Sequence, residues 1–260
     1  MESAAQKLGE QMKVYLINLD RRPDRLAEMT ERLNALGLEF ERVSAVDAKT
    51  AKFVWQVSWW KAVVYKLGHL PTRGAIACYY SHRYIWGDMI AKDISHALVF
   101  EDDAEVIEWD DALAKINLRD FELDLLRLQY TEASTWIDYG FDGQEMNIAG
   151  HKAVNEMSYG TVAYLITIAG AKKCHRLGKF WFPVDCFDLW TKVVGLRTSV
   201  LRPSMFEQSD SITDIQISTT GDLVPRFPKI DHLFLRPIAR PLLKHARRIL
   251  IASQTRSLST

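Results

Sequence analysis

The stretch KVYLINLDRRPDRLAEMTERLNALGLEFERV, residues 13–43, predicts the fold class of this chain. Lys13 to Asn18 is rich in β-branched and aromatic residues, as a buried strand is. A proline, Pro23, then opens a segment with helical periodicity, which Gly37 is suited to end. The apolar positions of that helix are Leu26, Met29, Leu33 and Leu36. A second strand is expected over residues 39–43, and strand, helix, strand at this spacing opens an α/β fold with a parallel sheet.

Further elements of the same kind follow along the chain. Apolar patterning predicts a helix over residues 74–90 and another over residues 169–177. Strands are expected at residues 96–100, 123–130 and 160–167. Asp20, ahead of Arg21, Arg22 and Pro23, is expected to cap the first helix. The overall expectation is a mostly parallel central sheet flanked by helices.

Composition is that of an ordinary globular protein. The 260 residues are 48% apolar and 25% charged, enough for one large α/β domain with a sizeable core. Residues 1–11 lack the apolar stretch of a secretory signal, and no window approaches the roughly 18 apolar residues of a membrane span. Three widely spaced cysteines, Cys78, Cys174 and Cys186, form no C-x-x-C pair. A zinc ribbon and a disulfide framework are therefore unsupported, and a reducing cytoplasm is expected, with the cysteines as small buried residues.

Charge is unevenly distributed, although the formal net charge is zero. From residue 226 onward, eight Lys or Arg face one acid, Asp231, so this segment carries +7. Pro241 can open a helix there with one apolar face, formed by Leu242, Leu243, Ala246, Ile249 and Leu250. Such a basic amphipathic helix is suited to an anionic membrane surface. The alternative is a helix packed on its own domain with a solvated basic face.

The triplet Glu101-Asp102-Asp103 directly follows the strand expected at residues 96–100. Three adjacent acids repel one another unless a positive charge compensates them. Ligands bind at the carboxyl ends of strands in parallel α/β sheets. A divalent ion such as Mg²⁺ or Mn²⁺, which takes carboxylate and phosphate oxygens, is the simplest compensation. The alternative is an acidic turn that caps a following element.

Four segments of the chain, taken in order, carry a resemblance to a known family. They are Val14 to Arg25 (VYLINLDRRPDR), Gly74 to His82 (GAIACYYSH), Leu98 to Asp103 (LVFEDD), and the stretch from Gly160 to Tyr164 through Pro183 to Asp185, Pro203-Ser204 and Gln208. The chain resembles glycosyltransferase family 25, the lipooligosaccharide galactosyltransferase family. The resemblance covers about residues 13–215.

The resemblance implies a GT-A-type fold over residues 12–225. A nucleotide-binding half would span about residues 12–130, and an acceptor half about residues 131–225. Residues 226–260 would form the basic C-terminal segment.

The resemblance also gives the acidic triplet the role of a D-x-D-type motif. Asp103 is then the best metal ligand, with Glu101 and Gln208 as further ligands. Glu101 or Asp102 would contact the donor ribose or a metal-bound water. Asp210 and His232 are weaker late contributors to the metal or diphosphate site. The ion, Mn²⁺ or Mg²⁺, would stabilise the departing UDP.

Six polar residues are candidate contacts to the nucleotide sugar: Asn18, Asp20, Arg25, Asp47, Ser81 and His82. The first three follow the first strand, and Asp47 follows the second. A helix cap with surface charge is the alternative for the first three residues. For the pair Ser81 and His82, on an expected helix, the alternative is an ordinary structural role.

An inverting transfer needs a carboxylate to deprotonate the acceptor hydroxyl. Asp185 and Asp188 are the leading candidates, and the sequence does not choose between them. The preceding aromatic stretch, residues 180–182, is suited to stacking on a sugar ring. Asp138 and Asp142 are weaker alternatives.

The sequence thus predicts a metal-dependent inverting transferase that moves a hexose, galactose from UDP-galactose, to a lipopolysaccharide or lipooligosaccharide core. It would work in the cytoplasm, peripherally on the inner face of the bacterial inner membrane, where a lipid-linked acceptor is made. A catalytically silent glycan- or partner-binding module and a sugar nucleotidyltransferase are the alternatives. The latter is disfavoured because no G-x-x-x-x-G-K-[ST] loop is present. Nucleic acid is not an expected partner, since no recognition motif occurs.

Overall fold

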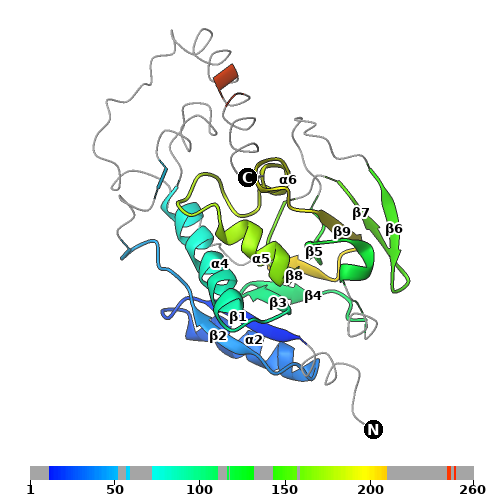
Figure 1. Ribbon diagram of the computed structural model, residues 1–260. Coiled ribbons are helices and arrows are strands. Elements are labelled where there is room, and N and C mark those ends of the chain that lie inside the picture. The colour runs from blue at the N-terminus through cyan, green and yellow to red at the C-terminus, as the bar shows by residue number, and fades with distance from the viewer. Residues whose placement is uncertain are drawn as a thin grey trace, which may run out of the picture.

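The computed structural model describes residues 12–51, 57–58, 72–110, 116, 118–131, 143–156, 159–209, 245, 246 and 249, with Asp188 described only in its backbone. Eight strands form a central sheet in the order β2-β1-β3-β8-β5-β9-β7-β6 (Figure 1). They are β1 (Lys13–Asn18), β2 (Glu41–Ser44), β3 (His96–Glu101), β5 (Leu125–Arg127), β6 (Glu145–Ile148), β7 (His151–Val154), β8 (Ala163–Thr167) and β9 (Thr198–Arg202). Strands β4 (Ala104–Val106) and β10 (Phe206–Gln208) pair separately. The helices are α2 (Pro23–Ala35), α4 (Arg73–Ala91), α5 (Ile168–His175) and α6 (Phe187–Val194), with a 3₁₀ turn at Leu118–Phe121.

The opening strand–helix–strand unit is confirmed. β1 pairs in parallel with both β2 and β3, and α2 lies between β1 and β2 in the chain. Gly37 follows the end of α2 with a φ of 68°, a left-handed conformation that glycine adopts without strain. The cap predicted at Asp20 is wrong. Helix α2 begins at Pro23 with Arg22 as its N-cap and without a side-chain cap bond. Asp20 instead accepts hydrogen bonds from Arg42 and Ser44 because it faces β2.

The central sheet is mixed rather than mostly parallel. Three of its seven strand pairings are parallel, and the other four are antiparallel. The difference arises because β8 runs antiparallel between β3 and β5, and β7 runs antiparallel beside β9 and pairs with β6 in a hairpin. The start of β8 therefore lies at the edge where β3 ends. Because β8 lies between β3 and β5, the two predicted halves share one sheet, and their functional division stays a prediction.

Side chains on the two faces of the sheet belong to two apolar layers. On β1, Tyr15 and Ile17 pack in the cluster that contains α4 residues, whereas Val14 and Leu16 pack with Met29 of α2. This alternation is what the period of a β-strand dictates. Helices α4 and α5 lie together on one face, and α2 lies apart from them beside β1 (Figure 1). The parallel pairing of β1 with β2 and β3 brings the carboxyl ends of these three strands to one edge.

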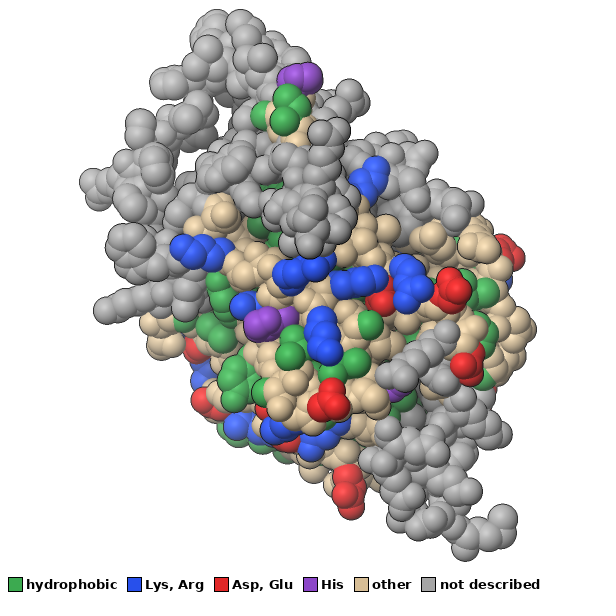
Figure 2. Space-filling view, viewed as in Figure 1, with side chains coloured by type: hydrophobic (Ala, Val, Ile, Leu, Met, Phe, Trp, Pro, Cys, Tyr) green, Lys and Arg blue, Asp and Glu red, His purple; other side chains and the backbone are tan. Residues whose placement is uncertain are grey.

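Positive charge gathers on the face covered by α5. Figure 2 shows Lys and Arg side chains grouped over this part of the molecule. Lys172, Arg176 and Lys179 are exposed there, and the segment from residue 168 to residue 182 contains no acid. Basic side chains therefore gather on this face as well as in residues 226–260.

Several predictions concern residues outside the described part of the chain. These are Asp138, Asp142, Asp210, His232 and nearly all of the C-terminal segment, of which His245, Ala246 and Ile249 are described as helical. The amphipathic helix there stays a prediction. Among the described residues, none of the helices is both long and apolar enough to span a membrane.

Candidate active site

The acidic triplet lies at the carboxyl edge of the sheet. Glu101 is the last residue of β3, and Asp102 and Asp103 form the turn that leads into β4. β4 pairs antiparallel with β10, in the register Ala104 to Gln208. The turn is therefore held from two sides, by the end of β1 and by β10.

Asp102 is an anchoring residue. Its carboxylate accepts hydrogen bonds from Asn18 Nδ2 at 2.8 Å, from the Leu19 backbone N–H at 3.4 Å and from Arg25 Nη1 at 3.1 Å. The Arg25 side chain is only 6% exposed, so this ion pair is largely shielded from water. Asp102 thus ties the turn to β1 and to the start of α2, and its charge is already compensated.

Asp103 has fewer hydrogen-bonding partners than Asp102, and its charge is less well compensated. Its Oδ2 accepts one hydrogen bond from Gln208 Nε2 at 3.0 Å, and Arg25 lies 3.8 Å away. Its Oδ1 is buried and has no hydrogen-bond partner among the described residues. Burial, followed by the charge of Glu101, raises the pKa of Asp103 to about 6. A buried carboxylate oxygen without a partner is costly. This donor atom therefore fits a cation, and Gln208 holds the carboxylate in place.

Glu101 belongs to a hydrogen-bonded chain. Its Oε1 lies 3.1 Å from His82 Nε2 and accepts a hydrogen bond from the Thr161 hydroxyl. The other ring nitrogen of His82, Nδ1, lies 2.8 Å from the Tyr164 hydroxyl. Burial opposes ionisation, but the bonds from His82 and Thr161 hold the pKa of Glu101 below its ordinary value. Glu101 thus stays ionised beside Asp103, whose pKa is raised.

A cavity of about 90 Å³ opens beside these groups. Six predicted site residues line it: Arg25, Ser81, His82, Glu101, Asp102 and Asp103. Ala45, Val46 and Ala48, together with residues in the first turns of α4, contribute to its other walls. The geometry therefore brings together the first strand, the helix motif and the acidic triplet.

Ser81 and three predicted contacts that do not line the cavity, Asn18, Asp20 and Asp47, form hydrogen bonds within the protein. Asn18 bonds Asp102 and Arg42, and Asp20 bonds Arg42 and Ser44. Asp47 accepts from Arg21 Nε at 3.0 Å. Ser81 lines the cavity, but its hydroxyl accepts from the Val46 N–H and donates to the Ala77 carbonyl, each at 2.9 Å. These bonds support the cavity walls, and a direct nucleotide contact at these positions stays a prediction.

The candidate base Asp185 lies just before α6. Burial raises the pKa of the Cys78 thiol, and the negative charges of Glu101, Asp185 and Asp103 raise it further. The charge of Asp185 thus acts on Cys78, although Asp185 is not among the described residues that line the cavity. The side chain of Asp188 lies outside the described residues.

The stacking role predicted for Phe180, Trp181 and Phe182 is wrong. All three side chains are at most 2% exposed. They are buried because they pack in the core: Phe180 against Tyr79, and Phe182 against Trp190. A sugar ring therefore cannot reach them in this structure.

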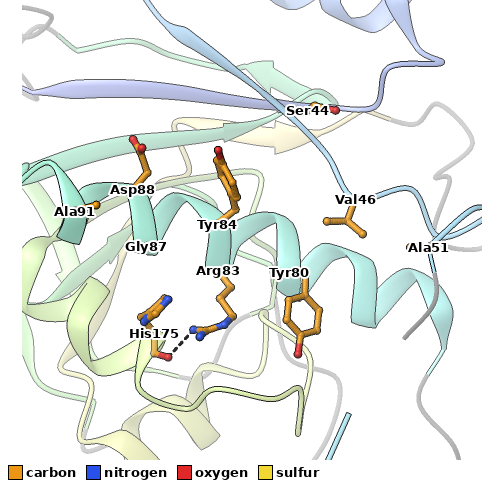
Figure 3. A pocket seen from close by; sticks show the side chains of 10 residues that line it. All are labelled: Ser44, Val46, Ala51, Tyr80, Arg83, Tyr84, Gly87, Asp88, Ala91 and His175. Atoms are coloured by element: carbon orange, nitrogen blue, oxygen red, sulfur yellow. Dashed lines mark hydrogen bonds between the residues drawn. The ribbon is translucent and has the colours of Figure 1, made fainter. Parts of the chain in front are cut away.

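A second, larger cavity of about 570 Å³ lies along α4, and none of the triplet residues lines it. Figure 3 shows the side chains around this cavity. Its polar groups already bond their neighbours. Arg83 donates to the His175 carbonyl at 2.5 Å, and Asp88 accepts from the Tyr15 hydroxyl at 2.6 Å. Since it contains no group of carboxylates, we take the smaller cavity as the candidate active site.

Thr161, Tyr164 and Cys78 are the site residues that sequence reasoning missed. Thr161 and Tyr164 bond Glu101 and His82, but only the antiparallel pairing of β8 with β3 reveals this. Cys78 was expected to be a buried apolar residue, yet it lines the cavity. Its position one helical turn before His82 was the only signal in the sequence.

The fold and the site together define a class: an α/β protein with a cavity-lining acidic cluster at the carboxyl edge of its sheet, where ligands of α/β enzymes bind. The family model described as glycosyltransferase family 25 (LPS biosynthesis protein) matches residues 11–187. The chain therefore belongs to glycosyltransferase family 25.

Similar proteins include one named as a galactosyltransferase and one named as inactive. The chain is 34% identical over 196 residues to a glycosyltransferase 25 family member of Anopheles gambiae, a match over 66% of this chain and 30% of the relative. It is 32% identical over 174 residues to procollagen galactosyltransferase 1-A of Xenopus laevis, over 62% of this chain and 27% of the relative. It is 28% identical over 200 residues to the inactive glycosyltransferase 25 family member 3 of Mus musculus, over 67% of this chain and 31% of the relative. The chain thus spans less than a third of the length of these relatives.

Proposed function

We propose that this chain is an active, metal-dependent, inverting hexosyltransferase that uses UDP-galactose and extends a lipopolysaccharide or lipooligosaccharide core. The family description supports a role in lipopolysaccharide synthesis, and the procollagen galactosyltransferases support galactose as the donor sugar. The GT-A-type assignment is part of this proposal. The observation that carries it is the buried Asp103 carboxylate, whose Oδ1 has no partner among the described residues.

The residues around Asp103 fit a hard divalent cation such as Mn²⁺ or Mg²⁺. Such ions prefer carboxylate oxygens and keep positions open for water or phosphate. When bound, the ion would supply positive charge to the leaving diphosphate. Asp103 would hold it, with Glu101 nearby. Gln208 presents its amide nitrogen to Asp103, so its role in this arrangement is to position the carboxylate.

The proposal also gives roles to the residues that hold the turn and to the candidate bases. Asp102 and Arg25 keep the turn rigid, so that Asp103 keeps its place while the donor binds. The nucleoside of the donor would lie along Ala45, Val46 and Ala48 and extend out of the cavity, because about 90 Å³ is too small to enclose it. Asp185 or Asp188 would accept the proton of the acceptor hydroxyl, on the face of the sugar opposite UDP.

The main alternative is a silent glycan- or partner-binding module. It is favoured by one observation, the similarity to relatives named inactive. Against it, the acidic triplet is complete and forms one wall of a cavity. A sugar nucleotidyltransferase is less well supported, since the family match is to glycosyltransferases.

The first test is UDP release from a panel of UDP-sugars, with and without Mn²⁺, using truncated lipopolysaccharide core as acceptor. We expect metal-dependent turnover with UDP-galactose that exceeds the turnover with UDP-glucose by about tenfold or more, since a site that bonds a hydroxyl rejects its epimer. Donor binding is measured by calorimetry on the same samples. Failure to bind any UDP-sugar in the presence of Mn²⁺ would favour the silent module.

We also propose that the basic C-terminal segment holds the enzyme on the inner face of the inner membrane, near a lipid-linked acceptor. Deleting residues 241–260 should shift the protein from anionic vesicles to the supernatant in a sedimentation assay. Changing Lys244, Arg247 and Arg248 to Gln keeps the apolar residues and should weaken binding by about 100-fold, at about 1 kcal/mol for each charge. Vesicles of neutral lipid are the control. Unchanged binding of both variants would contradict this location.

A further inference from the structure

Three different kinds of metal-binding atom meet at the wall of the cavity. The Cys78 sulfur, a ring nitrogen of His82 and a carboxylate oxygen of Glu101 all lie within 4.8 Å of one another. Cys78 and His82 are four residues apart on α4, so both side chains point from one face of the helix. Glu101 reaches the same point from the end of β3. The cluster therefore joins the helix to the sheet.

The spacing of this cluster suits a small tetrahedral ion. Ligand atoms bound to zinc at about 2.0 to 2.3 Å lie about 3.5 Å from one another. His82 Nε2 and Glu101 Oε1 are already 3.1 Å apart. Only a small movement of the Cys78 thiol is then needed, because this side chain, although it packs against the core, also lines the cavity.

Two hydroxyl groups hydrogen-bond the His82 and Glu101 side chains and would hold them in place as metal ligands. Nδ1 of His82 lies 2.8 Å from the Tyr164 hydroxyl, which would fix the ring with Nε2 toward the ion. The Thr161 hydroxyl bonds Glu101 in the same way. Outer partners of this kind orient the ligands and are a regular feature of metal sites.

Charge and ligand type decide which ion fits. The negative charges of Glu101 and Asp103 act on the Cys78 thiol, so the surroundings favour a cation. A thiolate and an imidazole select zinc over magnesium or manganese, which prefer oxygen ligands. The cluster is thus chemically different from the oxygen site at Asp103.

We propose that Cys78, His82 and Glu101 form a zinc site, with a water molecule as the fourth ligand. Binding releases the thiol proton of Cys78 to solvent, and a sulfur–zinc bond replaces the sulfur–hydrogen bond. The ring proton of His82 moves from Nε2, where it is shared with Glu101, to Nδ1, which then donates to the Tyr164 hydroxyl, so that Nε2 can bind the ion. The ion ties α4 to the end of β3. This inference goes beyond the proposed transfer reaction and does not depend on it.

The test is a zinc titration of the metal-free full chain against a chromophoric chelator. We expect one zinc ion per chain, and a Cys78→Ser variant that binds it more than about 100-fold more weakly, because even loss of an outer partner costs 10- to 100-fold. Cys174→Ser removes a buried thiol from α5 and should leave zinc affinity unchanged. Tyr164→Phe should weaken binding by about tenfold.

Cobalt gives a readout that requires no variant. Co²⁺ added to the wild-type chain should produce the absorption of thiolate-to-cobalt charge transfer, and zinc should abolish that absorption. Asp103→Asn should keep the zinc site, which separates this proposal from the transfer reaction. Equal zinc affinity of wild type and Cys78→Ser, or a wild-type chain without thiolate–cobalt absorption, would overturn it.

Discussion

Asp103→Asn is expected to lower kcat/KM for sugar transfer by about 100- to 1,000-fold, the usual loss when a preorganised charge-stabilising group is removed. The substitution keeps the shape of the side chain and its contact with Gln208, but removes the negative charge that would hold the ion. The loss corresponds to about 3 to 4 kcal/mol of transition-state stabilisation. Initial rates of UDP release at saturating Mn²⁺ measure it.

Although Asp103→Asn should lose activity, its free energy of unfolding should not fall. The raised pKa of Asp103 means that the folded, metal-free protein holds this proton more tightly than the unfolded chain does. The resulting penalty is absent below pH 4 and develops as the pH rises to about 6. At pH 7 and without metal, Asp103→Asn should therefore unfold with a free energy equal to that of the wild type or about 1 to 2 kcal/mol higher.

Asp102→Asn is the matched control, with the same chemical change one residue earlier. Asp102 is paired with Arg25 and bonded by Asn18, so its loss should lower the free energy of unfolding by about 2 kcal/mol. A higher free energy of unfolding for Asp103→Asn and a lower one for Asp102→Asn would show that Asp103 is suited to bind a cation, whereas Asp102 anchors the turn. Full turnover of Asp103→Asn at any Mn²⁺ concentration would refute the role of Asp103.

The parts of the site that the sequence predicted are those fixed by local pattern. Strand β3 is a continuous apolar run, and the acids that follow it must lie where the strand leaves the core. Pro23 and Gly37 mark the two ends of α2 for reasons that hold in any protein. The edge position of the triplet follows from these elements alone.

The contacts between distant segments could not be predicted in this way. Gln208 reaches Asp103 through the pairing of β10 with β4, across more than a hundred residues of chain. Only the family resemblance had placed Gln208 near the site. Thr161 reaches Glu101 because β8 runs antiparallel to β3, and the direction of a buried strand is not written in its apolar pattern.

The aromatic stretch before Asp185 shows a different limit. Composition alone cannot distinguish an aromatic residue that stacks on a sugar from one that fills a core, because both need large apolar rings. Phe180 and Phe182 became core residues since Tyr79 and Trp190 lie opposite them. The sequence carried no information on those partners.

A second large effect is expected at Asp124, a buried residue that lies outside the site. Its side chain is 1% exposed and precedes β5. The carboxylate accepts from Lys173 Nζ at 2.6 Å, from the Arg197 backbone N–H at 2.9 Å and from Arg197 Nη2 at 3.2 Å. It therefore joins β5 to α5 and to the segment before β9.

Asp124→Asn should lower the free energy of unfolding by about 3 kcal/mol at pH 7, since breaking a buried ion pair leaves its polar partners unsatisfied. For a chain of this size that corresponds to a fall in Tm of about 6 to 12 °C. Glu122→Gln, which touches the same Arg197 from a side chain that is 87% exposed, should change stability by less than about 0.5 kcal/mol. Chemical denaturation of both variants measures the difference.

The pH dependence identifies the charge of Asp124 as the cause. Burial opposes its ionisation, but the hydrogen bonds from Arg197 and Lys173 hold the pKa of Asp124 below its ordinary value. A lowered pKa in the folded state means that this stabilisation is complete above the unfolded pKa of about 4 and is lost as the pH falls below it. The gap between wild type and Asp124→Asn should thus stay constant from pH 8 to about pH 5 and narrow at lower pH. A gap that is independent of pH down to pH 3 would mean that shape, not charge, makes Asp124 important.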